Sequence, residues 1–453
     1  MGKKPTEKKQ PMVFTSKFFY YEDLVEQIYD PKYKAVSFIR YAKADKELVR
    51  DPKYDWNNIL YLPIRDDLLD KGAVLLPNDA IDYGTELELE KELHDFIITW
   101  LDVSEDHLQK AVWYILLSWV IDNLHTIPYL RCLGDYGTGK TRYLDVIGGL
   151  CYKPMFVGGA VRSAPIYRVI DLWRGTAIFD EFTLGKSDET EDIIQILNNG
   201  FQRGKPVLRC DSGNYEKVKA FDPFGAKILA TRSSFKDRAL ESRCITEIMQ
   251  VTTKRNIPVD YSDEFFSKRQ ELQNKLLMYR FKNIDKIKMD KTITIDFGNI
   301  IPRIKQSLFP FTVLFQHDKD RLHKFIQYTK EYNNKIIEEN STSFDGQIVN
   351  AYFELIEQRN MSEALDDYGT PEITASDVKD FLCANDGWNS DTLKASTIGR
   401  HLKSLGFENH ARKIGGHTKK ILCADENLLN ALRLRYIVTV VTEVTADTEQ
   451  VCL

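Results

Sequence analysis

One glycine-rich loop limits what this chain can fold into more than any other stretch of its sequence. Residues 134–141 read GDYGTGKT and fit the pattern G-x-x-x-x-G-K-[ST]. Residues 129–133 before the loop are apolar enough for a buried strand, and residues 142–150 after it favour a helix. This order is typical of a phosphate site in an α/β core. The alternative is a glycine turn that only joins the strand to the helix.

The residue types in the loop suit nucleotide chemistry. Glycines let backbone N–H groups turn inward around phosphates, Lys140 supplies a positive charge, and the Thr141 hydroxyl is a suitable magnesium ligand. The start of the following helix adds a partial positive charge. We therefore expect ATP and Mg²⁺ as cofactors. The expected nucleotide-binding residues of the loop are Gly134, Asp135, Tyr136, Gly137, Thr138, Gly139, Lys140, Thr141 and Arg142.

A second motif, GTAIFDEF at residues 175–182, is a short apolar strand that ends in two adjacent carboxylates. We expect Asp180 to hold magnesium, directly or through water. Glu181 points the other way at the strand end, so we expect it to polarise the attacking water. The alternative is a strand that ends in solvated acids.

Further polar residues follow in an order that suits the same site. Residues 226–232, AKILATR, predict a third strand, and Thr231 at its end could lie between the two motifs and orient the attacking water. Arg238 and Arg243 come next, where an arginine can reach the γ-phosphate of a neighbouring subunit's nucleotide. We favour Arg243; a surface arginine on a helix is the alternative. The candidate catalytic residues are therefore Lys140, Glu181, Thr231, Arg238 and Arg243.

Two arginines are candidates for closing over the nucleotide from a helical lid. Arg303 lies in the predicted helix IIPRIKQSLFP and is the preferred nucleotide-binding residue, whereas Arg280 in LLMYRF competes for the role. A hairpin is predicted upstream of the third strand, where residues 206–210 and 218–221 can pair around 211–217, a segment rich in turn formers.

The order and spacing of GDYGTGKT, AIFDEF, ILATR, ALESR and IPRIKQ resemble those of AAA+ ATPases, over about residues 90–338. Within AAA+ the chain is most similar to MCM-like replicative helicases of bacterial and archaeal mobile elements, such as staphylococcal cassette chromosomes and pathogenicity islands. MCM proteins usually have asparagine at the sensor strand, where this chain has Thr231.

The resemblance implies a homo-oligomeric ring, expected to be a hexamer, and a role for the predicted hairpin. In that family a hairpin before the sensor strand lines the central pore and grips the backbone of single-stranded DNA. An ordinary surface hairpin is the alternative. The hairpin residues expected to contact DNA are Asn214, Tyr215, Lys217 and Lys219.

The residue composition changes after residue 338. The polar stretch 340–346, NSTSFDG, suits a linker, and three predicted helices followed by a hairpin describe a winged helix. Residues 396–405 are the expected recognition helix and Gly415-Gly416 the wing. Residues 391–420 contain seven lysines and arginines against two acids, a basic patch suited to duplex DNA. Its expected DNA contacts are Thr397, Arg400, Lys403, Arg412 and Lys413. The alternative is a winged helix that binds protein.

The predicted fold class is therefore α/β: an AAA+ P-loop NTPase core with a helical lid, a small N-terminal domain and a C-terminal winged-helix domain. We place the N-terminal accessory domain at residues 1–90, the ATPase domain with its lid at 91–338, and the winged-helix domain at 339–453.

Composition narrows the class of protein further. The chain has 453 residues and a net charge of −5, so a surface for nucleic acid must be local. Its seven cysteines are scattered without a CxxC pair, which favours the reducing cytoplasm and argues against zinc. The longest apolar run, residues 111–121, is shorter than the roughly 20 residues that span a bilayer. We expect a buried helix there and no membrane partner.

Three functions fit these features. The first is an ATP-dependent DNA helicase that acts in replication of a mobile element or plasmid, as a ring that moves along one strand. The second is an AAA+ initiator or loader that binds origin DNA and uses ATP as a switch. The third is an AAA+ regulator that remodels a protein partner. The predicted hairpin favours the helicase.

Overall fold

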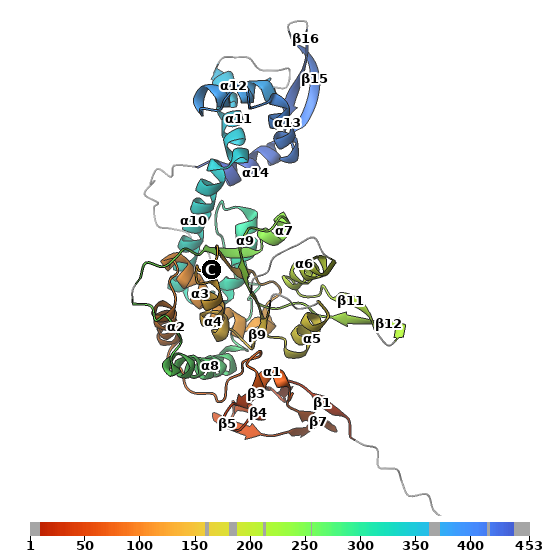
Figure 1. The fold of residues 1–453 in the computed structure, drawn as a ribbon, viewed down its shortest axis with the longest axis vertical. Helices are drawn as coiled ribbons and strands as arrows, with labels where there is room; N and C mark the ends of the chain where they lie inside the picture. The colour runs from red at the N-terminus through yellow and green to blue at the C-terminus, as the bar shows by residue number, and fades with distance from the viewer. Residues whose placement is uncertain are drawn as a thin grey trace, which may run out of the picture. The chain divides into compact units, whose positions relative to one another are not determined.

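The computed structural model describes residues 10–158, 163–180, 188–211, 214–254, 256–361, 372–414 and 417–438. The chain divides into two compact units, one of residues 1–294 and 306–318 and the other of residues 295–305 and 319–453. Figure 1 shows their elements. The predicted domain boundaries at 90/91 and 338/339 stay predictions.

The first unit begins with two small β-sheets. One is antiparallel with strand order β2-β3-β4-β5, and the other has the order β1-β7-β6. A short helix, α1 (Asp67–Asp70), follows them. The strands are β1 (Met12–Phe14), β2 (Lys17–Tyr20), β3 (Asp23–Asp30), β4 (Ala35–Ala42), β5 (Glu47–Asp51), β6 (Tyr54–Trp56) and β7 (Ile59–Leu62).

The centre of the first unit is a five-stranded parallel sheet with the order β14-β8-β13-β10-β9. Nearly every residue of its three middle strands is buried, which explains why they are continuous apolar runs. The strands are β8 (Tyr129–Leu133), β9 (Pro154–Val157), β10 (Thr176–Phe179), β13 (Lys227–Thr231) and β14 (Cys244–Ile248). A parallel sheet of this kind fits a P-loop NTPase-like core.

Register brings the ends of the motif-bearing strands to one edge. Thr231 of β13 pairs with Leu133 of β8, and Phe179 of β10 pairs with Leu229 of β13. The glycine-rich loop, Asp180 and Thr231 therefore meet at the carboxyl edge, with β13 between the other two strands. This is the place expected for Thr231.

Helices pack against this sheet. The helix α2 (Glu86–Trp100) begins with a capping box of Thr85 and Glu88, and α3 (Glu105–Trp119) is capped by Ser104. Most of the apolar run 111–121, predicted to be a buried helix, lies in α3, in which every residue from His107 to Trp119 except Gln109 is buried. The remaining helices are α4 (Lys140–Val146), α5 (Ser163–Trp173), α6 (Asp188–Gly200), α7 (Arg238–Glu241) and α8 (Asp263–Asn283).

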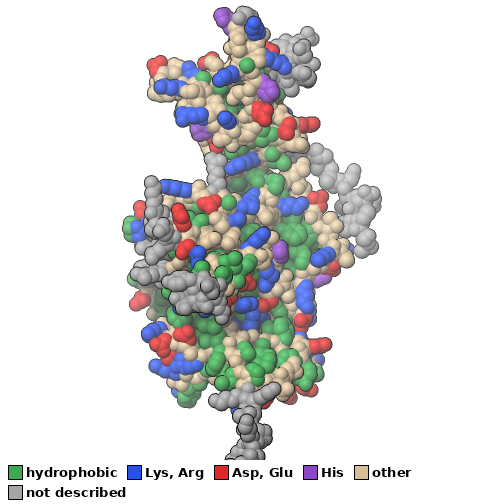
Figure 2. Space-filling model, turned by 90° about the vertical axis from the view of Figure 1, so that its right-hand side faces the viewer, with side chains coloured by type: hydrophobic (Ala, Val, Ile, Leu, Met, Phe, Trp, Pro, Cys, Tyr) green, Lys and Arg blue, Asp and Glu red, His purple; other side chains and the backbone are tan. Residues whose placement is uncertain are grey.

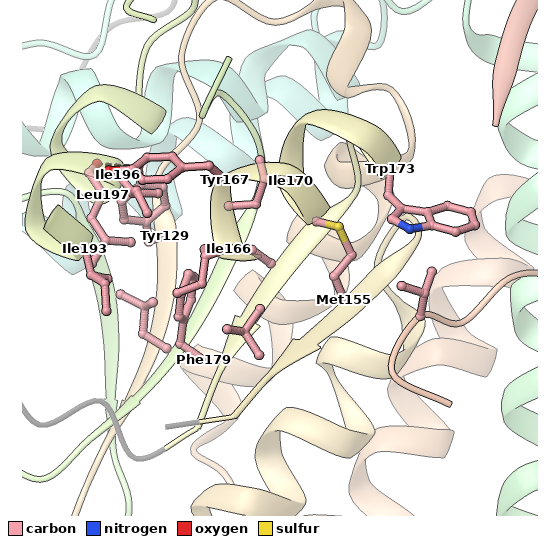
Figure 3. Close-up of a cluster of buried hydrophobic side chains, with 14 of the residues drawn as sticks. Tyr129, Met155, Ile166, Tyr167, Ile170, Trp173, Phe179, Ile193, Ile196 and Leu197 are labelled. Atoms are coloured by element: carbon pink, nitrogen blue, oxygen red, sulfur yellow. Dashed lines mark hydrogen bonds between the residues drawn. The ribbon is translucent and has the colours of Figure 1, made fainter. Parts of the chain in front are cut away.

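A hydrophobic core fills the space between the sheet and two of these helices. Figure 3 shows Ile166 and Ile170 of α5 and Ile196 of α6 gathered over strands of the sheet, with Phe179 beneath them. Trp173, at the end of α5, is fully buried in the same cluster. This packing fixes α6 and β10, which flank the acidic motif.

A buried ionic network joins the N-terminal sheet to the sheet core. Glu26 of β3 is 1% exposed and binds Lys153 Nζ at 2.8 Å and Arg280 Nε of α8 at 2.7 Å. Arg280 also binds Asp122 at 2.6 Å, and the Tyr152 hydroxyl donates to Glu26 at 2.8 Å. Burial opposes ionisation of Glu26, but the charges of Lys153 and Arg280 hold its pKa below the usual range.

The network corrects one sequence-based interpretation. The sequence offered Arg280 as a lid arginine that closes over the nucleotide. In the structure it is 0% exposed, and its guanidinium binds Glu26, Asp122 and the carbonyl oxygen of Trp119. It is therefore a structural residue of the N-terminal interface. Its partner Glu26 lies 254 positions away in sequence, beyond the reach of any local pattern.

The second unit is mainly helical and has its own core. Its helices are α10 (Lys319–Thr342), α11 (Phe344–Met361), α12 (Ala375–Asn385), α13 (Ala395–Ser404) and α14 (Glu426–Tyr436), and α9 (Pro302–Leu308) lies at the junction of the two units' segments. Strands β15 (Glu408–Ile414) and β16 (His417–Cys423) form an antiparallel hairpin, as the sequence predicted. The expected wing residues Gly415 and Gly416 lie outside the described residues.

The linker expected at residues 340–346 is wrong. Helix α10 continues to Thr342 and α11 begins at Phe344, so only Ser343 separates them. The Ser343 hydroxyl accepts a hydrogen bond from Gly346 N at 3.1 Å, which starts the new helix. Polar composition alone did not distinguish this capped junction from an extended linker.

We predict that Glu26→Gln lowers the free energy of unfolding by about 3–5 kcal/mol, because Lys153 would stay buried without its carboxylate partner. Urea denaturation measures the change. The control is Glu47→Gln, the same substitution at an exposed position of β5, which should change stability by less than about 0.5 kcal/mol. Equal effects of the two substitutions would contradict the role of the network.

Candidate nucleotide-binding site

The glycine-rich loop has a backbone that only glycine tolerates at key points. Gly137 and Gly139 have φ values of 73° and 89°, in the left-handed region. A Cβ on Gly134 would lie 2.7 Å from Thr138 Oγ1 and 2.8 Å from the carbonyl oxygen of Met249. The loop therefore keeps a tight curve whose interior is lined by backbone.

Lys140 opens helix α4 and is 6% exposed. Its Nζ donates hydrogen bonds to the carbonyl oxygens of Gly134 at 2.8 Å and Asp135 at 2.6 Å, so the amine lies across the loop. A pocket of about 320 Å³ opens there. Its lining residues are Tyr136, Gly137, Gly139, Lys140, Thr141 and Arg142.

The expected magnesium ligands lie together. The Thr141 hydroxyl donates to Asp180 Oδ2 at 3.3 Å, although the two residues come from different motifs. The other carboxylate oxygen of Asp180, Oδ1, is buried and makes no hydrogen bond. A hydroxyl and a carboxylate with one unused buried oxygen fit a hard cation such as Mg²⁺. Among the described residues no larger cluster of acidic, histidine or cysteine ligands occurs.

Thr231 meets the geometric requirement for a residue that contacts a water or phosphate. It is 1% exposed, and its hydroxyl oxygen has no hydrogen-bond partner. Its carbonyl oxygen accepts a hydrogen bond from Gly134 N at 3.1 Å, which ties β13 to the glycine-rich loop. A buried hydroxyl without a partner is costly unless a ligand or water satisfies it. Its catalytic role stays a prediction.

Several expected site residues are not described in full. Glu181 lies outside the described residues, and so do the side chains of Arg238, Asn214, Tyr215 and Lys217. Their predicted roles are neither supported nor contradicted. Arg303 lies on α9, which the structure describes, and its expected contact with the nucleotide stays a prediction.

Arg142 is held by the protein itself. Its guanidinium donates to the carbonyl oxygen of Val259 at 2.5 Å, and also to that of Pro258, and lies 5.2 Å from the ring centre of Tyr261. These contacts attach the start of α4 to the segment before α8. Direct binding of the nucleotide by Arg142 stays a prediction.

Arg243 lies at the opposite end of the sheet from the loop. Its carbonyl oxygen bonds to Tyr129 N at the start of β8, five residues before the loop begins. With a rise of about 3.3 Å per residue, this places Arg243 roughly 16 Å from its own loop. The guanidinium is half-buried against Asn198 and lies 5.5 Å from the ring centre of Phe201. Arg243 therefore cannot serve the nucleotide of its own subunit.

The predicted hairpin is confirmed, with a tighter turn than expected. Strands β11 (Val207–Asp211) and β12 (Asn214–Phe221) pair antiparallel, with an irregularity at Cys210/Asp211. Residues 214–217, which the sequence placed in the turn, thus belong to strand β12. Figure 1 shows the hairpin projecting from the sheet core.

The base of the hairpin is fixed and its outer face is apolar. Arg209 of β11 donates to the Tyr167 hydroxyl at 2.6 Å and binds Asp192 of α6. Leu208 and Val218 on the other face are 60% and 57% exposed.

Sequence reasoning missed one residue at this edge. Arg232 follows Thr231 directly, and its guanidinium lies 3.6 Å from the ring centre of Tyr136 in the glycine-rich loop and donates to the Tyr136 hydroxyl. The sequence did carry a signal, because a cation next to the expected sensor residue ends the same strand.

The basic patch of the second unit is only partly exposed. Arg400, Lys403 and Lys413 are exposed, whereas Arg412 is half-buried 3.7 Å from Glu372. Arg400 donates to the Thr397 hydroxyl at 3.3 Å, so the two share one face of α13. Lysine and arginine side chains are spread over this unit at the top of Figure 2. Their contact with DNA stays a prediction.

No helix in the described part of the chain is both long and apolar enough to cross a membrane.

Comparisons with known proteins give distant structural likenesses. No protein-family model matches the chain, and a search of curated proteins finds no match. Among solved structures the chain is similar to the apo C-terminal region of NrS-1, with a TM-score of 0.36 and 10% identity over 88% of this chain and 97% of that chain.

Two further solved structures overlap with parts of the chain. JCV helicase gives a TM-score of 0.24 and 14% identity over 60% of this chain and 66% of that chain. The RuvB Holliday junction branch migration motor of Thermotoga maritima gives a TM-score of 0.22 and 15% identity, over 75% of this chain and 98% of that chain. At these TM-scores, assignment of a P-loop NTPase-like core rests on the sheet and the loop.

We predict that Lys140→Ala weakens binding of Mg-ATP by about 10- to 100-fold, because a charge-assisted hydrogen bond contributes about 1.5–3 kcal/mol. Titration of a fluorescent ATP analogue measures the affinity. Lys53→Ala, at an exposed position between β5 and β6, is the control and should bind as the parent does. Unchanged affinity in Lys140→Ala would remove the loop as the nucleotide site.

Proposed function

We propose that this protein is an ATP-dependent DNA helicase that works as a ring and takes part in replication of a mobile element or plasmid. One observation carries the proposal: the hairpin β11–β12 is inserted between helix α6, which follows the acidic motif, and strand β13, which ends beside the nucleotide loop. A change at the phosphate edge therefore has a short covalent path to a projecting hairpin.

The exit of the hairpin is also tied to β13 by contacts. Lys227, the first residue of β13, is 0% exposed and donates hydrogen bonds to the carbonyl oxygens of Pro223 at 2.8 Å and Gly225 at 3.0 Å. These carbonyls belong to the segment that leaves β12. Its amine also reaches Gly200 at the end of α6, at 3.4 Å. The strand, the helix and the hairpin base thus meet at one buried amine.

In the proposed mechanism the loop holds Mg-ATP. Lys140 would bind the phosphates, and Thr141 and Asp180 would hold Mg²⁺, which would supply positive charge at the phosphates. Glu181 activates the attacking water, which Thr231 orients. The developing charge is stabilised by Arg243 of the neighbouring subunit, since Arg243 is too far from its own loop.

The hairpin then grips single-stranded DNA. Lys217 and Lys219 are the proposed countercharges for phosphate and Tyr215 the proposed stacking residue. Positions 215, 217 and 219 alternate along one side of β12. The exposed Leu208 and Val218 on the other side suit contact with the hairpin of the next subunit.

A second candidate function is an AAA+ replication initiator or loader. The basic exposed residues of α13 and of the β15–β16 hairpin favour it, because a winged helix with such a patch suits duplex DNA. In that case hydrolysis acts as a timer and little strand separation occurs. The two functions differ in whether the protein unwinds DNA repeatedly.

We predict that mixing Arg243→Ala subunits with Lys140→Ala subunits restores part of the ATPase activity that each lacks alone. In a mixed ring, an intact loop can face an intact arginine of the next subunit. Steady-state phosphate release across mixing ratios measures the rescue. Absence of rescue at every ratio, with mixed rings shown to form by co-purification, would contradict action in trans.

We predict that the double substitution Lys217→Ala, Lys219→Ala reduces stimulation of ATP hydrolysis by single-stranded DNA and leaves hydrolysis without DNA unchanged. Loss of two phosphate contacts should also lower the slope of log binding constant against log salt concentration for single-stranded DNA by about 1.4, at about 0.7 per contact. Lys205→Ala, an exposed lysine just before β11, is the matched control. Full stimulation in the double variant would show that the hairpin is not the DNA grip.

A further inference from the structure

The residue after the sensor threonine makes a contact that none of the expected motifs explains. The guanidinium of Arg232 lies over the ring of Tyr136, 3.6 Å from the ring centre, and donates to its hydroxyl. Both side chains are exposed, and Tyr136 lines the pocket of the glycine-rich loop. The end of β13 therefore brings a positive charge to the rim of this pocket.

The charge of a bound triphosphate calls for a further cation at the pocket, and Arg232 can supply it. The other two cations there, Lys140 and Arg142, already donate to carbonyl oxygens of the protein. A nucleoside triphosphate brings more negative charge than one Mg²⁺ and one lysine neutralise. A further cation at the rim would complete the balance, and the planar guanidinium suits a phosphate group.

Position favours the terminal phosphate over the inner ones. The loop and the start of α4 surround the inner phosphates in sites of this type, and Asp180 and Thr231 mark the side where hydrolysis takes place. Arg232 follows Thr231 in the sequence, and the Thr231 carbonyl oxygen accepts a hydrogen bond from Gly134 N of the loop. The backbone of Arg232 thus lies beside Thr231 and Gly134, and its guanidinium lies at the Tyr136 ring.

We propose that Arg232 is a phosphate-binding residue that leaves the ring of Tyr136 and contacts the terminal phosphate of ATP bound in the same subunit. The inference rests on the proposed nucleotide site and adds a residue that distinguishes triphosphate from diphosphate. A charge-assisted bond to phosphate is stronger than an exposed contact between arginine and a tyrosine ring. Tyr136 holds the arginine beside the pocket until the phosphate arrives.

The test compares affinities for a triphosphate and a diphosphate. Calorimetry with Mg²⁺ uses adenosine 5′-(β,γ-imido)triphosphate and ADP as the two probes, so that hydrolysis does not interfere. Arg232→Gln should lose about tenfold in affinity for the triphosphate, since one charge-assisted bond is removed, and stay within about twofold for ADP. Arg232→Lys keeps the positive charge but loses the planar guanidinium, so its affinity for the triphosphate should lie between those of the parent and Arg232→Gln.

Two further variants make the result specific. Arg50→Gln, at an arginine of the N-terminal sheet that pairs with Asp79, is the control and should bind both probes as the parent does. Tyr136→Leu removes the ring that Arg232 contacts. Because Tyr136 also lines the pocket, the readout for this variant is the ratio of triphosphate to ADP affinity, which should stay within about twofold of the parent's ratio. A tenfold fall in this ratio, equal to that in Arg232→Gln, would mean that the pair only supports the loop, and would overturn the proposal.

The remaining outcomes are also decisive. Equal losses for both probes in Arg232→Gln, or no loss for either, would overturn the role of Arg232 at the terminal phosphate while leaving the nucleotide site in place. Failure of the parent protein to bind either probe would instead contradict the proposed nucleotide site itself.

Discussion

Pairing of β13 between β8 and β10 is the constraint on which the site depends. Hydrogen bonds on both sides of this strand fix the register in which Thr231 lies beside Leu133 and Leu229 beside Phe179. Since all three strands run in parallel, the glycine-rich loop, Asp180 and Thr231 meet at one edge of the sheet. A shift of one residue would move the Thr231 hydroxyl to the other face and separate these groups.

The same strand connects the two ends of the core. Its first residue, Lys227, binds carbonyl groups at the hairpin exit, and its last residue contacts the glycine-rich loop through Gly134. A rigid, fully buried strand of five residues suits the transfer of a small movement from the phosphate edge to the hairpin base. Arg243 lies at the hairpin end of the sheet, away from the glycine-rich loop, and its action on another subunit stays a proposal.

Local patterns in the sequence predicted much of this site. The loop, the acidic strand and the sensor strand each lie within a few residues of the positions expected, because glycine spacing and buried apolar runs are local signals. The hairpin was also predicted from its turn formers, although its turn is shorter.

Contacts between distant segments were not predictable in the same way. Arg280 looked like a lid arginine, but its partners Glu26 and Asp122 come from remote parts of the chain. The capped junction at Ser343 looked like a linker because its polar residues give no periodic signal. The contact of Arg232 with Tyr136 depends on the register of β13 against β8, which a sequence pattern does not specify.

The most direct test of the account is strand separation on a forked, labelled DNA duplex with Mg-ATP, measured for the parent protein and for Lys140→Ala. We expect the parent protein to displace the labelled strand in an ATP-dependent reaction and the variant not to do so. Hydrolysis of ATP and binding of duplex DNA by the parent without any strand displacement would contradict a helicase and would favour the initiator or loader.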